Sequence, residues 1–403
     1  MGVREVVLVL NAGSSSLKFS VSAAVDARLV TARGQIESIG TSPRFSARDG
    51  SGVRLDDREL DGSVGDHRSA LDMLAGWLRA RFHGTRVVGV GHRVVHGGPR
   101  YAAPIVVSAQ VLHELRNLVP LAPLHQPHNL AAIDAVSDRL PGVPQVACFD
   151  TSFHRGHDPV VDLIPLPEKI RAAGVQRYGF HGLSYEYIAA VLPQQAPEIA
   201  HGRVLAAHLG SGASLCAMRD GRSVDTSLGF TALDGLCMST RPGSLDPGVV
   251  LYLFQGLGLS ASEVETMLYR QSGLLGLSGL SGDMRDLADS REPSARLAVD
   301  YFVYRAAREI ASLASVLGGI DGLVFTAGIG ERSAQIRARI CEASAWLGVE
   351  LDADANARNG PCISTPRSRI STWVIPTNEE LMIARHTVSM LGLLEAVPAT
   401  ARA

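Results

Sequence analysis

The chain has 403 residues, of which 46% are hydrophobic and 19% are charged, and its formal net charge is −2. This composition excludes an intrinsically disordered chain, and the near-neutral charge argues against a protein that binds nucleic acid or a membrane surface. The length predicts two or three domains with sizeable cores.

Two features predict a cytoplasmic protein. The N-terminus has no basic region followed by a long apolar run, so we expect no signal peptide. The five cysteines are widely spaced and form no CxxC pair, which predicts reduced thiols in the core. The most membrane-like stretch, residues 311–330, contains Asp321 and several Gly and Ser residues, so a buried helix end followed by a strand is the better interpretation.

The first predicted elements are two strands joined by a tight turn. Residues 6–10 form a continuous apolar run, and residues 17–22 alternate between apolar and polar side chains. The segment NAGSSSLK, residues 11–18, joins them. It lacks the spacing and the strand–loop–helix order of a P-loop, and a flexible linker would not separate two patterned strands. We therefore expect a β-hairpin with a tip rich in Gly and hydroxyl groups.

Helices and strands alternate after about residue 60, which is typical of α/β architecture. The spacing of apolar residues predicts helices over 69–81, 107–118 and 127–140, and strands over 86–95 and 143–149. The second of these strands delivers Asp150 at its C-terminal end.

A second strand–turn–strand segment covers residues 204–218 and echoes the first. GSSSL at 13–17 resembles SGASL at 211–215. The match is short enough to arise by chance, but the shared context favours a duplication that gives two similar domains around a cleft. The later predicted elements are helices over 247–255, 261–269 and 292–317, a strand over 321–325, a turn at 326–332 that leads into a helix over 333–345, a strand over 371–375, and a helix to about 394.

Three Gly-rich turns follow predicted strands, at residues 11–16, 209–214 and 327–331. Any one of them is weak evidence, because glycine after a strand usually marks only a tight turn. Together they suggest backbone amides and hydroxyls arranged around several phosphates. The third turn opens a predicted helix, whose N-terminus favours negative charge.

Charged residues near these turns suggest phosphate chemistry. Asp150 and Glu379 follow strands, and such carboxylates suit Mg²⁺, although Glu379 is equally well explained as an ordinary acidic residue in a first helical turn. Arg93, His181 and Arg241 lie in segments marked by Gly and His; for any single arginine a surface salt bridge is the simpler explanation. The spacing of His92, His96, His154 and His157 does not favour zinc.

Ten motifs in order resemble those of the acetate kinase family: VLVLNAGSSSLK, VGHRVVHGG, LAPLHQPHNL, FDTSFH, RYGFHG, HLGSGAS, GFTALDGL, SGDMRDL, TAGIGE and TNEELMIAR. They span the chain from Val7 to about Arg385. The resemblance implies an α/β fold with two duplicated ribonuclease H-like (actin-like ATPase) domains around a nucleotide cleft, and a homodimer. It also implies an N-terminal acyl-kinase domain of residues 1–154 with 380–403, and a C-terminal nucleotide-binding domain of residues 155–379.

The resemblance implies that ATP phosphorylates acetate to acetyl phosphate, reversibly and by direct in-line transfer with Mg²⁺, for which Mn²⁺ can substitute. The implied catalytic residues are Asp150, Arg93, Arg241 and His181. The implied acyl site is Arg93, Val95, Leu124 and Phe180, and the implied metal residues are Asn11 and Glu379. The implied ATP site comprises Asn11, Ser14, Ser16, Lys18, His208, Gly210, Ser211, Gly212, Asp283, Met284, Arg285, Gly328, Ile329, Gly330 and Glu331. His125 is implied, like His208, as a supporting cleft residue.

The chemistry explains why these residue types suit the reaction. A carboxylate substrate is already ionised, so no catalytic base is needed; the obstacle is repulsion between two anions, which Arg, His, Lys and Mg²⁺ offset. The chain departs from the family pattern at five positions, which bear on nucleotide and acyl preference: Ser211, Met284, Arg332, Tyr185 and Ala232 replace a usual Asn, Phe, Asn, His and Pro.

Two other functions compete with acetate phosphorylation. One is a kinase for propionate or another short-chain carboxylate. The other is an actin-like or chaperone-like ATPase, which explains the hairpins and the Mg²⁺ residues but not Arg93, Arg241 and His181.

Overall fold

The structure is a computed structural model that describes residues 4–13, 15–62 and 64–393. The chain divides into two compact units, residues 1–152 with 378–403 (unit 1) and residues 153–377 (unit 2). Both crossings lie at element ends: one in the 3₁₀ turn Ser152–His154, the other just before the C-terminal helix. The expected domain boundaries at 154 and 379 lie two residues from these divisions.

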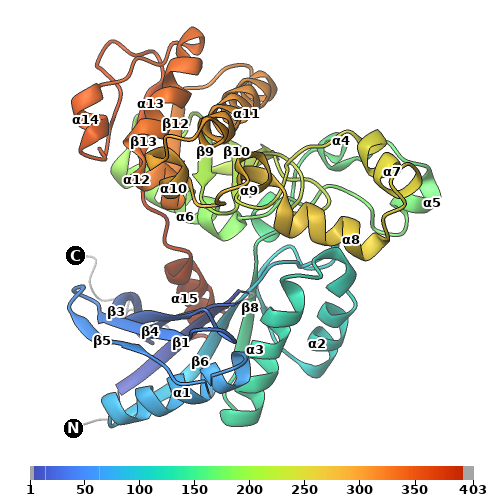
Figure 1. Cartoon of the computed structure of the whole chain (residues 1–403). Coiled ribbons are helices and arrows are strands. Elements are labelled where there is room, and N and C mark those ends of the chain that lie inside the picture. The colour runs from blue at the N-terminus through green and yellow to red at the C-terminus, as the bar shows by residue number, and fades with distance from the viewer. Residues whose placement is uncertain (1–3, 14, 63, 394–403) are drawn as a thin grey trace. The chain divides into compact units, whose positions relative to one another are not determined.

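Unit 1 is built on one mixed sheet in the order β5-β4-β3-β2-β1-β6-β8-β7 (Figure 1). Strands β1 to β5 form an antiparallel meander, β6 and β8 run parallel to β1, and β7 is antiparallel to β8. The bounds are β1 Arg4–Ala12, β2 Leu17–Ala23, β3 Asp26–Glu37, β4 Arg44–Asp49, β5 Arg54–Glu59, β6 Thr85–Val94, β7 Ile105–Val106 and β8 Gln145–Phe149.

Helices cover both faces of this sheet: α1 (His67–Arg81), α2 (Ala109–Arg116), α3 (Gln126–Arg139) and α15 (Glu379–Met390). In β6, Val90 packs into the core that includes residues of α1 and α3. Its neighbour Gly91 points to the opposite face, because side chains alternate along a strand. A Cβ on Gly91 would lie 2.2 Å from Thr387 Oγ1 of α15, so glycine is what lets α15 pack on this face.

Unit 2 is built on a five-stranded sheet in the order β11-β10-β9-β12-β13. Its strands are β9 Arg203–Leu209, β10 Ala213–Arg219, β11 Arg222–Thr226, β12 Gly322–Thr326 and β13 Ser371–Val374. Its helices are α4 Pro159–Asp162, α5 Glu168–Arg171, α6 Gly182–Gln195, α7 Pro247–Gln255, α8 Ala261–Thr266, α9 Gly273–Ser278, α10 Met284–Asp289, α11 Pro293–Leu317, α12 Ala327–Arg332, α13 Ala334–Ala343 and α14 Ala353–Ala357.

The two sheets share one topology. The order β3-β2-β1-β6-β8 in unit 1 corresponds to β11-β10-β9-β12-β13 in unit 2, and in both the first three strands are antiparallel and the last two parallel. This is the ribonuclease H-like arrangement, so the predicted duplication of an α/β domain is confirmed. The hairpin tips differ by one residue: the first spans residues 13–16 and the second 210–212. The number of residues that separates equivalent positions in the two hairpins therefore differs by one between their first and their second strands.

Most predicted elements are present within a few residues, and two predictions were wrong in detail. Residues 327–332, expected as a turn, form the short helix α12, which begins at Ala327 with φ +64°. The helix expected over 261–269 ends at Thr266 and continues as a π turn, Met267–Gln271. Residues 311–330 contain the end of α11 followed by β12, as expected. No helix among the described residues is long and apolar enough to cross a membrane. The five cysteines lie in the described part of the chain and form no disulfide there, and four of them are buried.

Candidate functional site

A buried ion pair stands at the C-terminal ends of β6 and β8. Arg93 and Cys148 are register partners on these parallel strands, so Arg93 and Asp150 emerge side by side. The guanidinium binds the carboxylate with both ends: Arg93 Nε lies 2.9 Å from Asp150 Oδ1, and Nη2 lies 2.6 Å from Oδ2. The side chain of Asp150 is only 2% exposed and that of Arg93 is 21% exposed. Such a two-pronged pair fixes the orientation of the arginine.

Two more acceptor oxygens approach the same guanidinium. Arg93 Nη1 lies 3.4 Å from Asn11 Oδ1 at the end of β1 and 3.7 Å from Glu379 Oε2 at the start of α15. Burial opposes the charge of Arg93, but Asp150 and Glu379 outweigh it and raise the pKa of the guanidinium. We call Asn11, Arg93, Asp150 and Glu379 the ionic cluster.

Two further ionisable residues, Lys18 and Glu380, lie next to the ionic cluster. Lys18 is exposed on β2, where it is the register partner of Asn11. Burial and the neighbouring Glu379 raise the pKa of Glu380, while Lys18 and Arg93 oppose that rise. Ser16 closes the first hairpin tip by accepting a 2.8 Å hydrogen bond from Gly13 N at its backbone oxygen, and Ser14 lies outside the described residues.

Two buried amides that the sequence analysis did not single out hold the segment after β6. Asn129 on α3 accepts a 2.9 Å hydrogen bond from Val95 N and donates a 2.7 Å hydrogen bond to Ala12 O. Gln126 accepts from His96 N and donates to His96 O. Both are buried polar residues in the first turn of α3. Asn129 ties the first hairpin to the segment that follows Arg93, and Gln126 fixes the backbone of His96.

The predicted acyl residues are divided between the units. Val95 is buried directly after β6, and Leu124 and His125 are half-buried just before α3. Phe180 is also buried, but it belongs to unit 2. The ionic cluster therefore shares its unit with Val95 and Leu124.

In unit 2, Arg241 and His181 converge on the tip of the second hairpin. A Cβ on Gly212 would lie 2.9 Å from Arg241 Nη2 and 3.1 Å from His181 Nε2, so glycine is what permits both side chains to lie against this turn. Arg241 donates a 2.7 Å hydrogen bond from Nη1 to Ala232 O. Burial lowers the pKa of its guanidinium to about 10, so it still carries its charge at neutral pH.

His181 is part of a stacked pair of imidazoles. Its ring lies 4.2 Å from that of His208, centroid to centroid, with an interplanar angle of 14°. Serine hydroxyls meet both rings at Nδ1: Ser214 at 2.7 Å from His181 and Ser184 at 2.9 Å from His208. His181 itself has φ +58°, immediately before α6, so the backbone presents its ring from a left-handed conformation.

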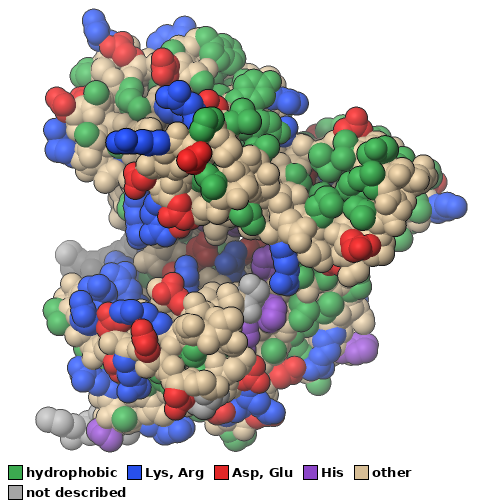
Figure 2. All heavy atoms as spheres, in the orientation of Figure 1, with side chains coloured by type: hydrophobic (Ala, Val, Ile, Leu, Met, Phe, Trp, Pro, Cys, Tyr) green, Lys and Arg blue, Asp and Glu red, His purple; other side chains and the backbone are tan. Residues whose placement is uncertain are grey.

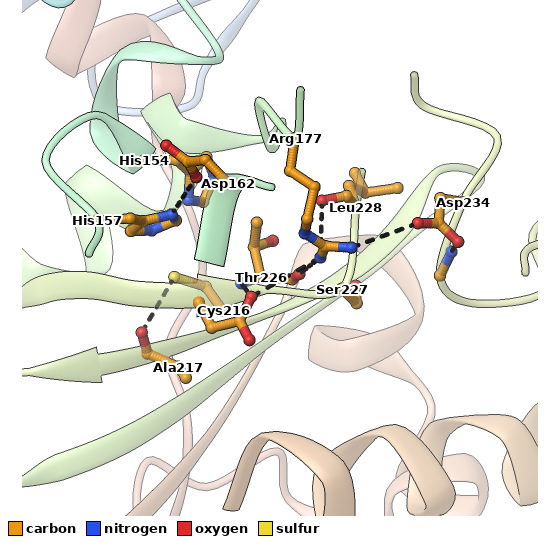
Figure 3. A network of polar contacts seen from close by, with 12 residues as sticks. His154, His157, Asp162, Arg177, Cys216, Ala217, Thr226, Ser227, Leu228 and Asp234 are labelled. Atoms are coloured by element: carbon orange, nitrogen blue, oxygen red, sulfur yellow. Dashed lines mark hydrogen bonds and ion pairs between the residues drawn. The ribbon is translucent and has the colours of Figure 1, made fainter. Parts of the chain in front are cut away.

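A polar network anchors the loop that carries His181 (Figure 3). His154 Nε2 contacts Phe180 O at 2.9 Å, and Ser223 Oγ lies within 2.9 Å of both His154 Nδ1 and His157 Nε2. His157 Nδ1 contacts Asp162 Oδ1 at 3.0 Å. Burial lowers the pKa of His154 to about 3, so its ring is neutral and Nε2–H donates to the Phe180 carbonyl.

Next to it, the Arg177 guanidinium links three loop segments, as Figure 3 shows. It donates to Thr226 O at 2.5 Å and to Leu228 O at 3.4 Å, and its Nη1 lies 3.7 Å from Asp234 Oδ2. His154 and His157 therefore hold the loop that carries His181. Among the described residues no group of three or more His, Cys, Asp or Glu side chains is arranged to hold a metal ion.

Seven of the residues expected to bind the nucleotide line one cavity of about 690 Å³ in unit 2. Gly210 and Ser211 come from the second hairpin, Asp283 to Arg285 from the start of α10, and Gly328 and Ile329 from α12; Arg332 lines it too. Asp283 caps α10 through Arg285 N at 2.8 Å, and Arg285 lowers the pKa of its carboxyl.

Of the other residues of unit 2 expected to bind the nucleotide, His208, Gly212, Gly330 and Glu331 are absent from the lining of this cavity. Glu331 Oε1 instead accepts hydrogen bonds from Ala327 N at 2.9 Å and Thr377 N at 3.0 Å. This carboxylate thus holds the left-handed start of α12, the helix that contributes Gly328 and Ile329 to the cavity lining.

The chain was compared with known proteins. The profile of the acetokinase family matches residues 6–385. An acetate kinase of Nitrobacter hamburgensis is 53% identical over 388 residues, covering 96% of each chain. The chain belongs to the acetokinase family. Members are kinases, so this protein is an enzyme that transfers a phosphoryl group.

Two solved structures of the family share this fold over nearly their whole length. A propionate kinase of Francisella tularensis has a TM-score of 0.88 at 36% identity, and an acetate kinase of Porphyromonas gingivalis has a TM-score of 0.84 at 34% identity. The match covers 96% of this chain and 100% of each of theirs. Both domains of the family are therefore present here.

Proposed function

We propose that this enzyme phosphorylates acetate with ATP to give acetyl phosphate, reversibly and by direct in-line transfer. The observation that carries this proposal is the arrangement at the second hairpin. Its residues Gly210 and Ser211 line the large cavity, and its residue Gly212 lies against Arg241 and His181. A nucleotide in the cavity would extend its phosphates along this turn toward two cationic or hydrogen-bonding side chains.

Unit 2 is the nucleotide-binding domain in this proposal. Asp283, Met284, Arg285, Gly328 and Ile329 contact the adenosine, while the backbone of residues 210–212 follows the phosphates. Arg241 and His181 donate to the transferring phosphoryl group, whose spread negative charge in the transition state is stabilised by fixed donors. Gly330 and Glu331 act through the shape of α12.

Unit 1 is the acyl-kinase domain. Arg93, with Val95 and Leu124 from the same unit, binds acetate; Asn11, Ser14, Ser16 and Lys18 serve the phosphate path. Asp150 holds the Arg93 guanidinium in a fixed orientation through two hydrogen bonds. No residue has to act as a general base, because acetate is ionised at neutral pH.

The donor set of the ionic cluster fits Mg²⁺. Its amide and carboxylate oxygens are hard ligands, and three of them approach the same guanidinium, which shows that they converge. Glu379 and Asn11 would hold the ion, directly or through water, and Asp150 would orient it. When bound, Mg²⁺ neutralises phosphate charge. Mn²⁺ prefers similar oxygen ligands and would substitute.

An acyl-hydroxamate assay tests the function. Purified enzyme, ATP, Mg²⁺ and acetate with hydroxylamine should give acetohydroxamate in proportion to the ADP formed. ADP release without hydroxamate would contradict the proposal and favour an ATPase that drives a conformational change. Repeating the assay with propionate and butyrate tests the runner-up substrate, which the similarity to a propionate kinase favours.

We also propose that the enzyme is a cytoplasmic homodimer. Helix α7 has a single buried residue, Leu253, although nearly all its residues are apolar. Hydrophobic side chains gather over the α4 and α7 region on the face drawn in Figure 2. Leu245, Val249, Leu251, Tyr252, Phe254 and Leu257 are exposed. A helix that is apolar all round is normally covered, and a second copy is the occupant that we propose.

The oligomeric state is read by sedimentation velocity, in which Leu251→Glu should shift a dimer to a monomer. Wild-type enzyme that sediments as a monomer would contradict the proposed homodimer. Cysteines that form no disulfide among the described residues fit a reducing compartment.

A further inference from the structure

The hydroxyl of Tyr185 is joined to His181 through Ser214. The Tyr185 Oη–Ser214 Oγ distance is 2.5 Å, and the Ser214 Oγ–His181 Nδ1 distance is 2.7 Å. Tyr185 and Ser214 are both fully buried, on α6 and β10. Tyr185 is also one of the five positions at which the sequence departs from the family pattern.

The direction of the hydrogen bonds follows from counting donors. The phenol oxygen of Tyr185 already accepts from the backbone of His208, and burial raises its pKa well above the usual value, so the phenol keeps its proton. In the described part of the chain, Ser214 Oγ is the acceptor that the structure gives this proton. The single proton of Ser214 is then left to donate to His181 Nδ1.

We propose that Tyr185 and Ser214 are positioning residues that fix the tautomer of His181, with Nδ1 as acceptor and the proton on Nε2. Nε2 is the nitrogen that lies beside Arg241 at Gly212. His181 therefore presents an N–H donor where the proposed function requires one for the transferring phosphoryl group. The inference rests on that function for its kinetic consequence, but the tautomer itself can be measured without it.

The reverse arrangement is disfavoured for a physical reason. If Nδ1–H donated to Ser214, Ser214 would either accept from Tyr185 as well or donate to it, and the buried serine proton or the buried phenol proton would lose its acceptor. An unsatisfied buried donor costs about 1–3 kcal/mol, which is enough to select one tautomer by tenfold or more.

The test combines Tyr185→Phe, Ser214→Ala and the double variant. Each single variant should lower kcat about tenfold, the worth of one buried hydrogen bond, with little change in KM for ATP. The double variant should be no slower than the slower single variant, because both substitutions break one path. Tyr178→Phe is the matched control: it removes a buried hydroxyl of the same unit, which donates to Gly174 O at 2.7 Å, and should keep wild-type kcat.

Histidine ¹⁵N NMR reads the tautomer directly. Cross-peaks that disappear in His181→Gln identify His181, and in the wild type they should show the Nε2–H pattern. In Tyr185→Phe and Ser214→Ala the pattern should shift toward Nδ1–H or a mixture. An unchanged pattern with wild-type kcat in both variants, or additive losses in the double variant, would overturn the inference.

If the wild type formed no acyl phosphate, the proposed function would fail while the NMR result still decided the tautomer. If Tyr185→Phe failed to fold, as judged by thermal unfolding, Ser214→Ala would test the same path from its other end.

Discussion

Each unit holds one arginine of the candidate site, and the two arginines lie in opposite electrostatic settings. In unit 1, Arg93 is held by Asp150 and approached by Glu379, and these carboxylates raise its pKa. In unit 2, Arg241 is held by the neutral carbonyl of Ala232, and burial lowers its pKa to about 10. None of the ion pairs formed among the described residues includes Arg241. The charge of Arg93 is compensated by carboxylates of the protein, whereas Arg241 is held by a neutral carbonyl.

This difference separates stability from function. A compensated arginine contributes to folding, because its removal leaves a buried carboxylate without a cation. The charge of Arg241 opposes folding at neutral pH, because its pKa in the folded chain lies below that in the unfolded chain. The following substitutions test whether the two arginines differ in this way. They are given in order of decreasing expected effect.

Arg241→Ala should lower kcat for acyl phosphate formation by roughly 10²–10⁴, since a fixed donor to the transition state is lost. The melting temperature should stay within a few degrees or rise. Steady-state kinetics and calorimetry measure both quantities. Arg367→Ala, at an exposed ion pair with Glu350, is the control. An Arg241→Ala enzyme with near-normal turnover would show that the assigned role is wrong.

Arg93→Ala should lower kcat by a similar factor of roughly 10²–10⁴. Unlike Arg241→Ala, it should destabilise the fold by about 3–5 kcal/mol, because the buried Asp150 loses its partner. Urea unfolding measures the loss. The double variant Arg93→Met with Asp150→Asn should recover most of the stability and none of the activity. Equal stability of Arg93→Ala and Arg241→Ala would remove the distinction between the two arginines.

Glu379→Ala should raise the Mg²⁺ concentration for half-maximal activity by about tenfold or more. Glu380→Ala should change it by about twofold, because only Glu379 approaches the Arg93 guanidinium. Titration of activity with Mg²⁺ compares the two neighbouring carboxylates directly. Similar effects in both variants would mean that the pair acts on the start of α15 and not on the metal.

Acid should destabilise both units in the same direction. Burial lowers the pKa of His92 in unit 1 to about 4 and that of His154 in unit 2 to about 3, from an ordinary value near 6.5. Between pH 6.5 and these lowered pKa values, each histidine is protonated in the unfolded chain and neutral in the folded chain. The free energy of unfolding should therefore fall, as pH drops below about 6.5, by up to about 1.4 kcal/mol per pH unit for each histidine.

Urea unfolding between pH 7 and pH 4.5 measures this slope. His154→Gln removes one of the two titrating groups and should make it shallower by about one proton. A slope in His154→Gln as steep as in the wild type would argue that His154 is charged in the folded chain.

The smallest expected effect concerns acyl length. Ala232 is half-buried, and its carbonyl holds Arg241, so this residue lies beside the proposed phosphoryl site. Propionate should have kcat/KM within roughly tenfold of acetate, since one methylene is worth about 1–3 kcal/mol in a pocket. Ala232→Pro keeps the carbonyl and adds bulk, and should widen the preference for acetate. A strict acetate preference in both enzymes would mean that Ala232 only shapes its turn.

The sequence predicted eight of the described strands, the longer helices other than α6, and the order of the motifs, because these depend on local periodicity and on residues that are adjacent in the chain. It did not place β3, β4, β5, β7 or β11. It determined Arg93, Asp150, His181 and Arg241 as candidates through the family resemblance. It did not reveal helix α6, in which Gly182 stands at the first position and Pro193 interrupts the pattern. Nor did it reveal the helical form of residues 327–332, where Glu331 satisfies the first backbone amide.

Only the tertiary structure decided how those candidates are paired. The Arg93–Asp150 bond joins ends of parallel strands, and the Tyr185–Ser214–His181 path joins a helix, a strand and a loop. Contacts across such sequence distances follow from sheet register and packing, which no local pattern encodes. The same holds for the opposite pKa shifts of the two arginines, because burial and neighbouring charge, and not residue type, set those shifts.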